Sequence, residues 1–320
     1  MIANDEFTRS QIELTFDIGP GAAAGTLIAV DRDQPGPVAL LISGSGPIDR
    51  NSDMKKLAIG VMGQIAQHLG AAGLSSFRYD KRGVGASEGD YLSTGFHDNV
   101  ADAAAAVEML RERPEIDPSQ IFVIGHSEGA LIATELGASD PNLAGITLLA
   151  GTATIGEEVL RWQAQQVAAT LPNPVKRLLR MLRQDIVRTQ TKRLAQIKAT
   201  TEDTARIQLV KINAKWFREF LTHDPGPSLA NVRAPVQAVT GSKDLQVNPD
   251  DVGRICELVP GDCSGHVVDD ITHLLRSETG PASVRTYKKQ AKRPLDPEVL
   301  DLITSWIAER VRQRSEGPTS

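Results

Sequence analysis

The chain has 320 residues, a formal net charge of −5 at pH 7, 41% hydrophobic residues and 23% charged residues. This composition is that of an ordinary globular protein with a sizeable core, and the acidic balance argues against a general nucleic-acid binder. No apolar run is long enough to span a membrane, and residues 1–6 lack the basic and apolar regions of a secretory signal, which predicts a cytoplasmic protein.

The first part of the chain alternates strand-like and helix-like stretches. Helices are predicted at residues 55–69, 100–110 and 131–136 from the spacing of their apolar positions. Strands alternating with helices of this length indicate βαβ units and a mostly parallel sheet, which is the α/β class. The predicted strands, where apolar side chains cluster between turn residues, are residues 12–16, 26–30, 38–42, 74–79, 121–124 and 146–149.

The composition changes after residue 152. Between residues 155 and 220 the chain has thirteen Lys or Arg and six Asp or Glu, and helix periodicity replaces the strand pattern. Because the α/β pattern resumes afterwards, residues 153–232 are interpreted as an all-helical insertion in a core formed by residues 1–152 and 233–320. Its basic excess is either a solvated face or a lid that attracts an anionic substrate or an acidic membrane surface. One predicted helix face combines Val175, Leu178, Leu179 and Leu182.

After the insertion, strands are predicted at residues 235–240 and 266–269, and helices at residues 250–258 and 297–312. The two cysteines, Cys256 and Cys263, are expected to be small reduced thiols, since their spacing alone does not show that they pair. Neither belongs to a four-ligand pattern, so no metal site is predicted.

Gly125, Ser127 and Gly129 form a G-x-S-x-G pattern between a predicted strand and a predicted helix. This context is the one that a nucleophilic serine needs. The glycines keep neighbouring chain from colliding with a sharp turn, and the helix N-terminus places partial positive charge beneath a developing oxyanion. The pattern predicts Ser127 as a nucleophile.

A serine nucleophile needs a base, which in this order of elements follows it in the chain. Three histidines follow Ser127. His223 lies at the end of the insertion, and His266 falls inside a predicted strand. His273 follows that strand in a loop, where a catalytic base belongs, so His273 is the predicted base.

The base in turn needs an orienting carboxylate after a strand. Asp244 lies in the turn directly after the strand predicted at residues 235–240, and it is the predicted acid. Asp250 and Asp251 are typical first-turn residues of a helix. The remaining rivals end the strand before the histidine and are Asp269 and Asp270.

An oxyanion hole needs two backbone N–H donors that point at one place. One is expected from Glu128, the residue after the nucleophile, and the other from the glycine-rich loop after the third strand. Ser45 is the predicted second donor, with Gly46 as the alternative. The loop is not a phosphate loop, because no Lys-Ser or Lys-Thr follows it.

A second glycine-rich turn follows the strand at residues 74–79. Asp80 and Arg82 are expected to fix this turn beside the site, although Arg82 is also a candidate clamp for an anionic substrate. The Glu128 side chain is expected to face solvent without a role, with a position at the edge of the pocket as the alternative.

Taken together, these motifs resemble the α/β-hydrolase superfamily, in its serine aminopeptidase-like or esterase group. The resemblance covers about residues 25–152 and 230–312. It implies a mostly parallel sheet of about eight strands, a helical cap inserted before the acid strand, hydrolysis through an acyl-serine intermediate, and no cofactor. The matching residues are 44–47 with 49–51, 78–83, 125–129, 241–244 and 272–274.

The predicted function is hydrolysis of small-molecule carboxylic esters by Ser127, His273 and Asp244. Two alternatives stay open. One is an aminopeptidase or amidase with the same triad, in which Glu128 or a carboxylate of the cap holds a substrate amine. The other is a hydrolase-fold binding protein with little turnover. The sequence assigns no role to residues 276–294, and it predicts neither the length of the acyl group nor the oligomeric state.

Overall fold

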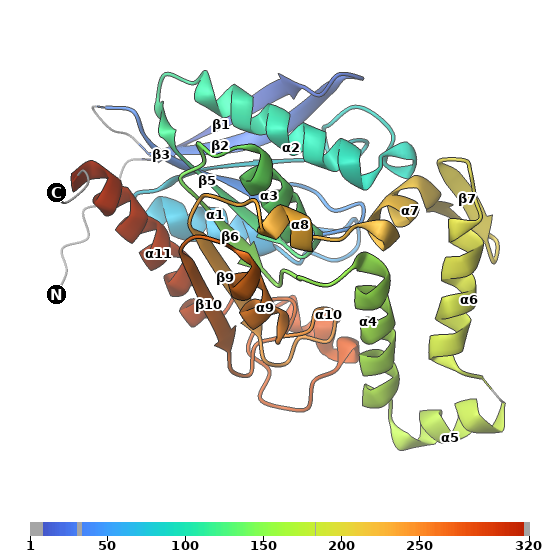
Figure 1. Ribbon diagram of the computed structural model, residues 1–320. Helices are drawn as coiled ribbons and strands as arrows, with labels where there is room; N and C mark the ends of the chain where they lie inside the picture. The colour runs from blue at the N-terminus through green and yellow to red at the C-terminus, as the bar shows by residue number, and fades with distance from the viewer. Residues whose placement is uncertain (1–8, 31–33, 183, 317–320) are drawn as a thin grey trace.

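The computed structural model describes residues 9–30, 34–182 and 184–316, so the predicted signal-free start lies outside the described residues. The centre of the molecule is an eight-stranded sheet in the order β1-β2-β4-β3-β5-β6-β9-β10 (Figure 1). β1, β2 and β4 pair antiparallel and all other neighbours pair parallel, which confirms the predicted α/β class. The strands are β1 (Arg9–Asp17), β2 (Ala22–Val30), β3 (Gly36–Ile42), β4 (Ser75–Tyr79), β5 (Ile116–His126), β6 (Gly145–Leu149), β9 (Val236–Gly241) and β10 (Cys263–Val268).

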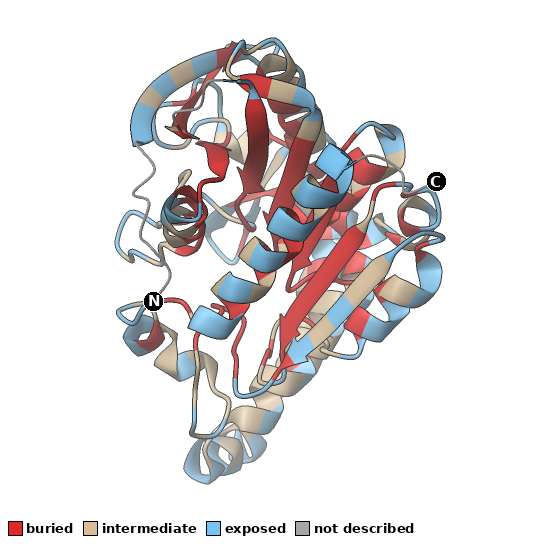
Figure 2. Cartoon of the chain, turned by 90° about the vertical axis from the view of Figure 1, so that its left-hand side faces the viewer, coloured by how far each residue is buried: buried red, intermediate tan, exposed pale blue. Residues whose placement is uncertain are grey.

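The inner strands are covered on both faces, which explains their continuous apolar sequences. Every residue of β3, β4, β6 and β9 is buried. The edge strand β1 instead has mostly exposed or half-buried residues, and Figure 2 shows the buried centre of the sheet between more exposed surroundings. The carboxyl ends of the parallel strands lie at one edge of this rigid layer, where loops can hold a site.

Two sets of helices cover the sheet. α1 (Val61–Ala71) and α11 (Pro297–Glu316) share one apolar core on one face. The core on the other face is formed with α2 (Phe96–Arg111), α3 (Glu128–Ser139), α8 (Gly226–Leu229) and α9 (Asp251–Leu258). Short elements in the remaining loops are η1 (Tyr91–Ser93), η2 (Val284–Thr286) and α10 (Tyr287–Gln290).

The helix predicted at residues 55–69 begins later in the structure, at Val61. Met54 and Leu57 exchange backbone hydrogen bonds in a tight turn, and Gly60 has a φ of +66° immediately before α1. A left-handed glycine interrupts helical backbone, so α1 begins at Val61. The apolar spacing from Leu57 onward therefore extends over a turn as well as a helix.

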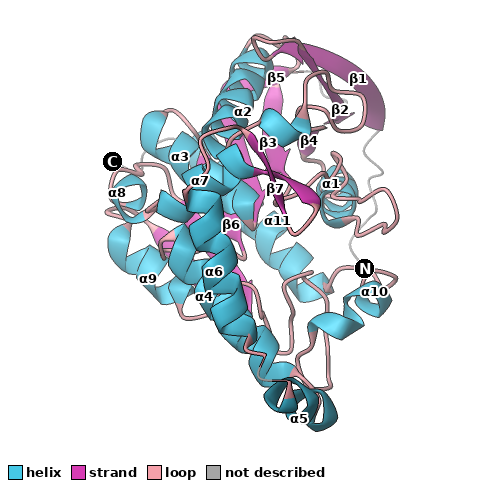
Figure 3. Ribbon diagram, turned by 90° about the vertical axis from the view of Figure 1, so that its right-hand side faces the viewer, coloured by secondary structure: helices cyan, strands magenta, loops and turns pink. Residues whose placement is uncertain are grey.

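The segment of residues 153–232 contains helices α4 (Gly156–Thr170), α5 (Asn173–Met181), α6 (Ile186–Lys198) and α7 (Ala214–Thr222) (Figure 3). The prediction that it is all-helical is wrong, because β7 (Thr204–Ile207) and β8 (Val210–Asn213) form a hairpin. Gln208 and Leu209 both have positive φ in its two-residue turn, as a type I′ turn requires. The Asn-Gly signal of such turns is missing, which explains why the sequence did not reveal it.

The predicted helix face around Leu178 lies on α5, at the end of the segment far from the sheet (Figure 1). No residue of α5 is buried, and Leu178 and Met181 are 50% and 72% exposed. Leu182 follows the last residue of the helix and is 55% exposed. In the described part of the chain, no helix has the length and apolar character that crossing a membrane requires.

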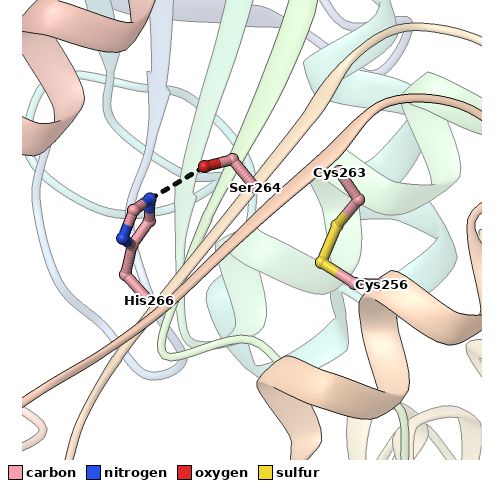
Figure 4. The surroundings of a disulfide bond; sticks show 4 residues. All are labelled: Cys256, Cys263, Ser264 and His266. Atoms are coloured by element: carbon pink, nitrogen blue, oxygen red, sulfur yellow. Dashed lines mark hydrogen bonds between the residues drawn. A yellow bond between two sulfur atoms is a disulfide. The ribbon is translucent and has the colours of Figure 1, made fainter.

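Cys256 and Cys263 form a disulfide between α9 and the start of β10 (Figure 4). The expectation of two reduced thiols is therefore wrong. The turn between the helix and the strand brings their Cα atoms to 5.3 Å, which is a separation that suits a disulfide. On the same strand, His266 is hydrogen-bonded to Ser264 at 2.8 Å.

Candidate active site

Ser127 lies in a sharp turn between β5 and α3, with φ 57° and ψ −116°. Two glycines make this turn possible by close backbone packing. A Cβ on Gly125 would lie 1.9 Å from the carbonyl oxygen of Gly129, and a Cβ on Gly129 would lie 2.1 Å from the carbonyl oxygen of Ile42. Ser127 itself is half-buried, so the turn presents its side chain at the start of a helix without covering it completely.

Asp244 and His273 come from separate loops and are hydrogen-bonded, with 2.8 Å between Oδ2 and Nδ1. The other oxygen of Asp244 accepts from the backbone N–H groups of Gln246 at 2.7 Å and Val247 at 3.0 Å. Asp244 and His273 are 3% and 4% exposed. When Nδ1 of His273 donates to this carboxylate, Nε2 is left as the acceptor that a general base needs.

His126 connects the loop of His273 to the serine turn. Its Nε2 donates to the carbonyl oxygen of His273 at 2.8 Å, and the two ring centroids lie 4.9 Å apart. Burial lowers the pKa of His126 to about 3, with a smaller effect from His273, so His126 is neutral at pH 7. The residue that precedes the predicted nucleophile is therefore in direct contact with the predicted base.

The segment of residues 276–294, which had no assignment from the sequence, supports the histidine loop. Arg276 is 1% exposed and donates to the carbonyl oxygens of Leu274 at 2.6 Å and Arg293 at 2.9 Å. Thr272 donates to Oε1 of Gln290 at 2.7 Å. Burial, with a smaller effect from Arg293, lowers the pKa of Arg276 to about 10. The segment thus fixes the backbone on both sides of His273.

The rival candidates have other partners. Asp251 accepts hydrogen bonds from the hydroxyl groups of Thr152 and Thr154. Asp270 pairs with Lys243 at 2.6 Å. His223 packs against Phe96, and burial is the main reason that its pKa is lowered.

A small pocket of about 70 Å³ lies between the serine turn and the segment of residues 153–232. Ser45, Ser127 and Glu128 line it together, as does Gln246, two residues after Asp244. A larger groove of about 420 Å³ between α4 and α6 shares Gln163 with it. Within the described ranges, no three His, Cys, Asp or Glu side chains are grouped to hold a metal ion. The other lining residues of the small pocket are Ala150, Thr152, Val159, Leu160, Gln163, Trp216, Phe220 and Val247.

The expectation that the Glu128 side chain faces solvent is wrong. It is 2% exposed, and its Oε2 lies 2.6 Å from Nζ of Lys81. Its Oε1 accepts from Asn99 at 3.1 Å and from the indole N–H of Trp216 at 2.5 Å. Sequence reasoning missed Lys81 because its partners lie 37 and 47 residues away, although Asp80 and Arg82 on either side were considered.

Asp80 and Arg82 fix the glycine-rich turn after β4, as predicted. Asp80 accepts from the backbone and side chain of Arg50 at 2.7 and 2.8 Å and from the backbone of Ala86 at 2.9 Å. Burial opposes ionisation of Asp80, but these donors outweigh it and hold its pKa below the ordinary value. Arg82 donates to Asp102 at 2.7 Å, so both side chains tie the turn to neighbouring elements.

The family model described as serine aminopeptidase, S33, matches residues 58–280 of this chain. The esterase EstD of Thermotoga maritima is 26% identical over 300 residues, which cover 92% of this chain and 67% of that protein. Both matches include the serine turn and the glycine-rich turn after β4.

Solved structures resemble the whole architecture. Est1E from Butyrivibrio proteoclasticus with ferulic acid bound has a TM-score of 0.64 at 14% identity, covering 94% of this chain and 100% of that one. The α/β hydrolase GrgF from a Penicillium species has a TM-score of 0.62 at 16% identity, covering 96% and 100%. At these identities the likeness shows the fold.

Proposed function

The chain belongs to the serine aminopeptidase (S33) family of α/β hydrolases, and from this premise we propose that it cleaves carboxylic esters with short acyl groups through an acyl-serine intermediate on Ser127. It is a hydrolase of the carboxylesterase type, in keeping with its similarity to EstD. The observation that carries the proposal is the buried hydrogen bond between Asp244 and His273, whose loop contacts the residue before Ser127.

In the first half of the reaction, the hydroxyl oxygen of Ser127 attacks the ester carbonyl carbon while Nε2 of His273 accepts the hydroxyl proton. The carbonyl oxygen becomes an oxyanion, which the backbone N–H groups of Glu128 and Ser45 would stabilise. Asp244 stabilises the imidazolium that forms and keeps its ring oriented. His273 then gives the proton to the leaving alkoxide, and an acyl-serine and a free alcohol result.

In the second half, water attacks the acyl-serine carbonyl carbon and His273 accepts one proton of that water. The second oxyanion occupies the same place as the first. When it collapses, Ser127 leaves and takes the proton back from His273, so the carboxylic acid is released and the protein is restored.

The pocket favours an ester over a substrate with a free amine. An aminopeptidase needs an acceptor for the substrate ammonium group, and Glu128 is the one carboxylate among the described residues that line the small pocket. Its oxygens already accept from Lys81, Asn99 and Trp216. An amine would have to displace a buried ion pair, which argues against the aminopeptidase alternative.

The size of the pocket limits the acyl group. Its volume of about 70 Å³ is far below the roughly 300 Å³ at which pockets for drug-sized ligands begin. Leu160 and Phe220, from the segment of residues 153–232, are among its lining residues. We therefore assign short acyl groups, such as acetyl and propionyl, to this pocket.

The test compares p-nitrophenyl propionate with p-nitrophenyl alaninate, two esters of matched size that differ in an amino group, together with alanine p-nitroanilide. The proposal predicts the highest kcat/KM for the propionate after correction for spontaneous hydrolysis. Preference for the alaninate, with turnover of the anilide, would favour the aminopeptidase. A protein that binds the propionate without turning it over would be a binding protein.

A further inference from the structure

We propose that Lys81 is a positioning residue for the oxyanion hole, and that its ion pair with Glu128 sets both backbone donors at once. This inference rests on the proposed function. Lys81 and Glu128 have side chains that are 5% and 2% exposed, and Nζ lies 2.6 Å from Oε2. The same Nζ donates to the carbonyl oxygen of Gly44 at 2.7 Å.

The contact with Gly44 determines where the N–H of Ser45 points. The carbonyl of Gly44 and the N–H of Ser45 belong to one peptide unit, and the described chain has no cis peptide bond. In a planar trans peptide the C=O and N–H bonds point in opposite directions. Lys81 holds the oxygen, and it thereby fixes the direction of the N–H.

This peptide unit adjoins the nucleophile. A Cβ placed on Gly44 would lie 3.3 Å from Cβ of Ser127 and 3.3 Å from the carbonyl oxygen of His126. Ser45 lines the same small pocket as Ser127. Gly44 is therefore both the anchor that Lys81 holds and the residue that permits the close approach.

The ion pair also reaches the second donor. Glu128 supplies a backbone N–H at the start of α3, and its own side chain holds Lys81. The two donor segments, far apart in the sequence, are thus joined through one ammonium group. Oε1 of Glu128 accepts from Trp216 on α7 at 2.5 Å, which connects the arrangement to the segment of residues 153–232.

Charge adds to the effect of geometry. An ammonium group on the carbonyl oxygen of Gly44 polarises that peptide and makes the N–H of Ser45 a stronger donor. The ester carbonyl is neutral in the ground state and becomes negatively charged in the transition state. The stronger N–H donor therefore stabilises mainly the transition state.

The central variant is Lys81→Met, which removes the ammonium group and keeps an unbranched side chain. We expect kcat for p-nitrophenyl acetate to fall roughly 10- to 100-fold with KM changed less than about threefold, somewhat below the loss from deleting an oxyanion donor itself. The control is Arg111→Met, which removes a partly buried ion pair with Asp140 at the far end of α3 from Ser127. Neither residue touches an oxyanion segment, so the kcat of this variant should stay at the parent value.

A second readout separates positioning from general structural support. A trifluoromethyl ketone with a short alkyl chain adds Ser127 reversibly and forms an oxyanion in the same place as the reaction. Its inhibition constant should rise in Lys81→Met by about the factor by which kcat/KM falls. In Arg111→Met the inhibition constant should not change.

Lys81→Met leaves a buried unpaired carboxylate and can therefore fold poorly. The double variant Lys81→Met/Glu128→Gln removes both charges, and the amide oxygen can still accept from Trp216. We expect it to fold and to show the same loss of kcat and of inhibitor affinity. A folded double variant with kcat within about threefold of the parent, or with inhibitor affinity unchanged while kcat falls, would overturn the proposal. If the parent itself has no esterase activity, the proposed function fails instead.

Discussion

Asp244 has both carboxylate oxygens engaged within the protein. One accepts from the backbone of Gln246 and Val247, and the other faces Nδ1 of His273. The backbone donors fix the plane of the Asp244 carboxylate, and the fixed carboxylate in turn orients the imidazole of His273. If an asparagine stood at this position and its amide oxygen accepted from the backbone, its NH2 group would face Nδ1 of His273. Nδ1 would then have to accept, and the proton would lie on Nε2, which is the wrong tautomer for a general base.

We therefore predict that Asp244→Asn lowers kcat for p-nitrophenyl acetate by about 10⁴-fold, as loss of the acid does in the general serine-histidine-aspartate template. KM should change little, since Asp244 does not contact the substrate. Asp269→Asn is the control, because Asp269 is exposed and was a rival acid in the sequence. Steady-state kinetics of both variants check this, and equal activities would refute the role of Asp244.

His126 makes stability depend on pH. Its pKa of about 3 lies below the ordinary value of 6.5, mainly because of burial. Between these values the unfolded chain binds a proton that the folded chain does not, so acid favours unfolding. The contribution of His126 is complete above the unfolded pKa and is lost as the pH falls toward the folded pKa.

We predict that the free energy of unfolding falls less steeply with acid in His126→Gln, whose amide can still donate to the carbonyl of His273. Between pH 6.5 and pH 4.5 the parent should lose about 2 kcal/mol more than the variant. Urea unfolding of both proteins at both pH values measures this difference in unfolding free energy. The contributions of other titrating groups, such as His223, are the same in the two proteins and cancel. Parallel pH dependences in the two proteins would contradict the buried neutral state of His126.

At the scale of elements, α4 and α7 bring side chains over the serine turn. Leu160 and Trp216 line the small pocket from these helices, which belong to the segment of residues 153–232 and not to the eight-stranded sheet. In the proposed function, acyl selectivity therefore depends on the segment of residues 153–232, and bond cleavage depends on loops of the sheet. This division allows one to be changed without the other.

Leu160→Ala should enlarge the pocket and move the preference toward longer acyl groups. We expect the ratio of kcat/KM for p-nitrophenyl butyrate to that for the acetate to rise roughly tenfold, the scale of one or two methylene groups in an apolar pocket. Leu178→Ala is the matched control, since Leu178 is 50% exposed on α5 and does not line the pocket. A ratio that is the same in both variants would count against this acyl site.

The disulfide joins α9 to β10 at a sequence separation of seven residues. Closing so short a loop removes little disorder from the unfolded chain, so the double variant Cys256→Ser/Cys263→Ser should lose about 2 kcal/mol of unfolding free energy. Cys263 begins β10, whereas the loop of His273 follows its other end, so kcat should be unchanged. Urea unfolding and esterase kinetics test the two statements separately, and loss of turnover in a folded variant would contradict the second.

For the whole molecule, the sequence revealed what depends on local patterns. Continuous apolar runs marked the buried strands, and Gly125, Ser127 and Gly129 marked the turn at the end of β5. The order of Asp244 and His273 after later strands indicated which side chains meet. These features are predictable because burial and close backbone contact restrict the residues that are allowed at each position.

What the sequence did not reveal depends on partners far apart in the chain. Lys81 and Glu128 meet because β3, β4 and β5 are neighbours in the sheet, and nothing local to either residue indicates the pair. The support of His273 by Arg276 and Gln290 is of the same kind. The hairpin of β7 and β8 was hidden for a different reason, since its turn residues Gln208 and Leu209 are not typical of left-handed backbone.

Covalent labelling with a fluorophosphonate, followed by digestion and mass spectrometry, tests most directly whether Ser127 is an activated nucleophile. Phosphonylation releases fluoride and leaves the phosphonyl group on the attacking oxygen. The account predicts one labelled peptide, the one that contains Ser127, and strongly reduced labelling in a folded His273→Ala variant. Labelling at another residue, or equal labelling of Ser127 in the two proteins, would contradict it.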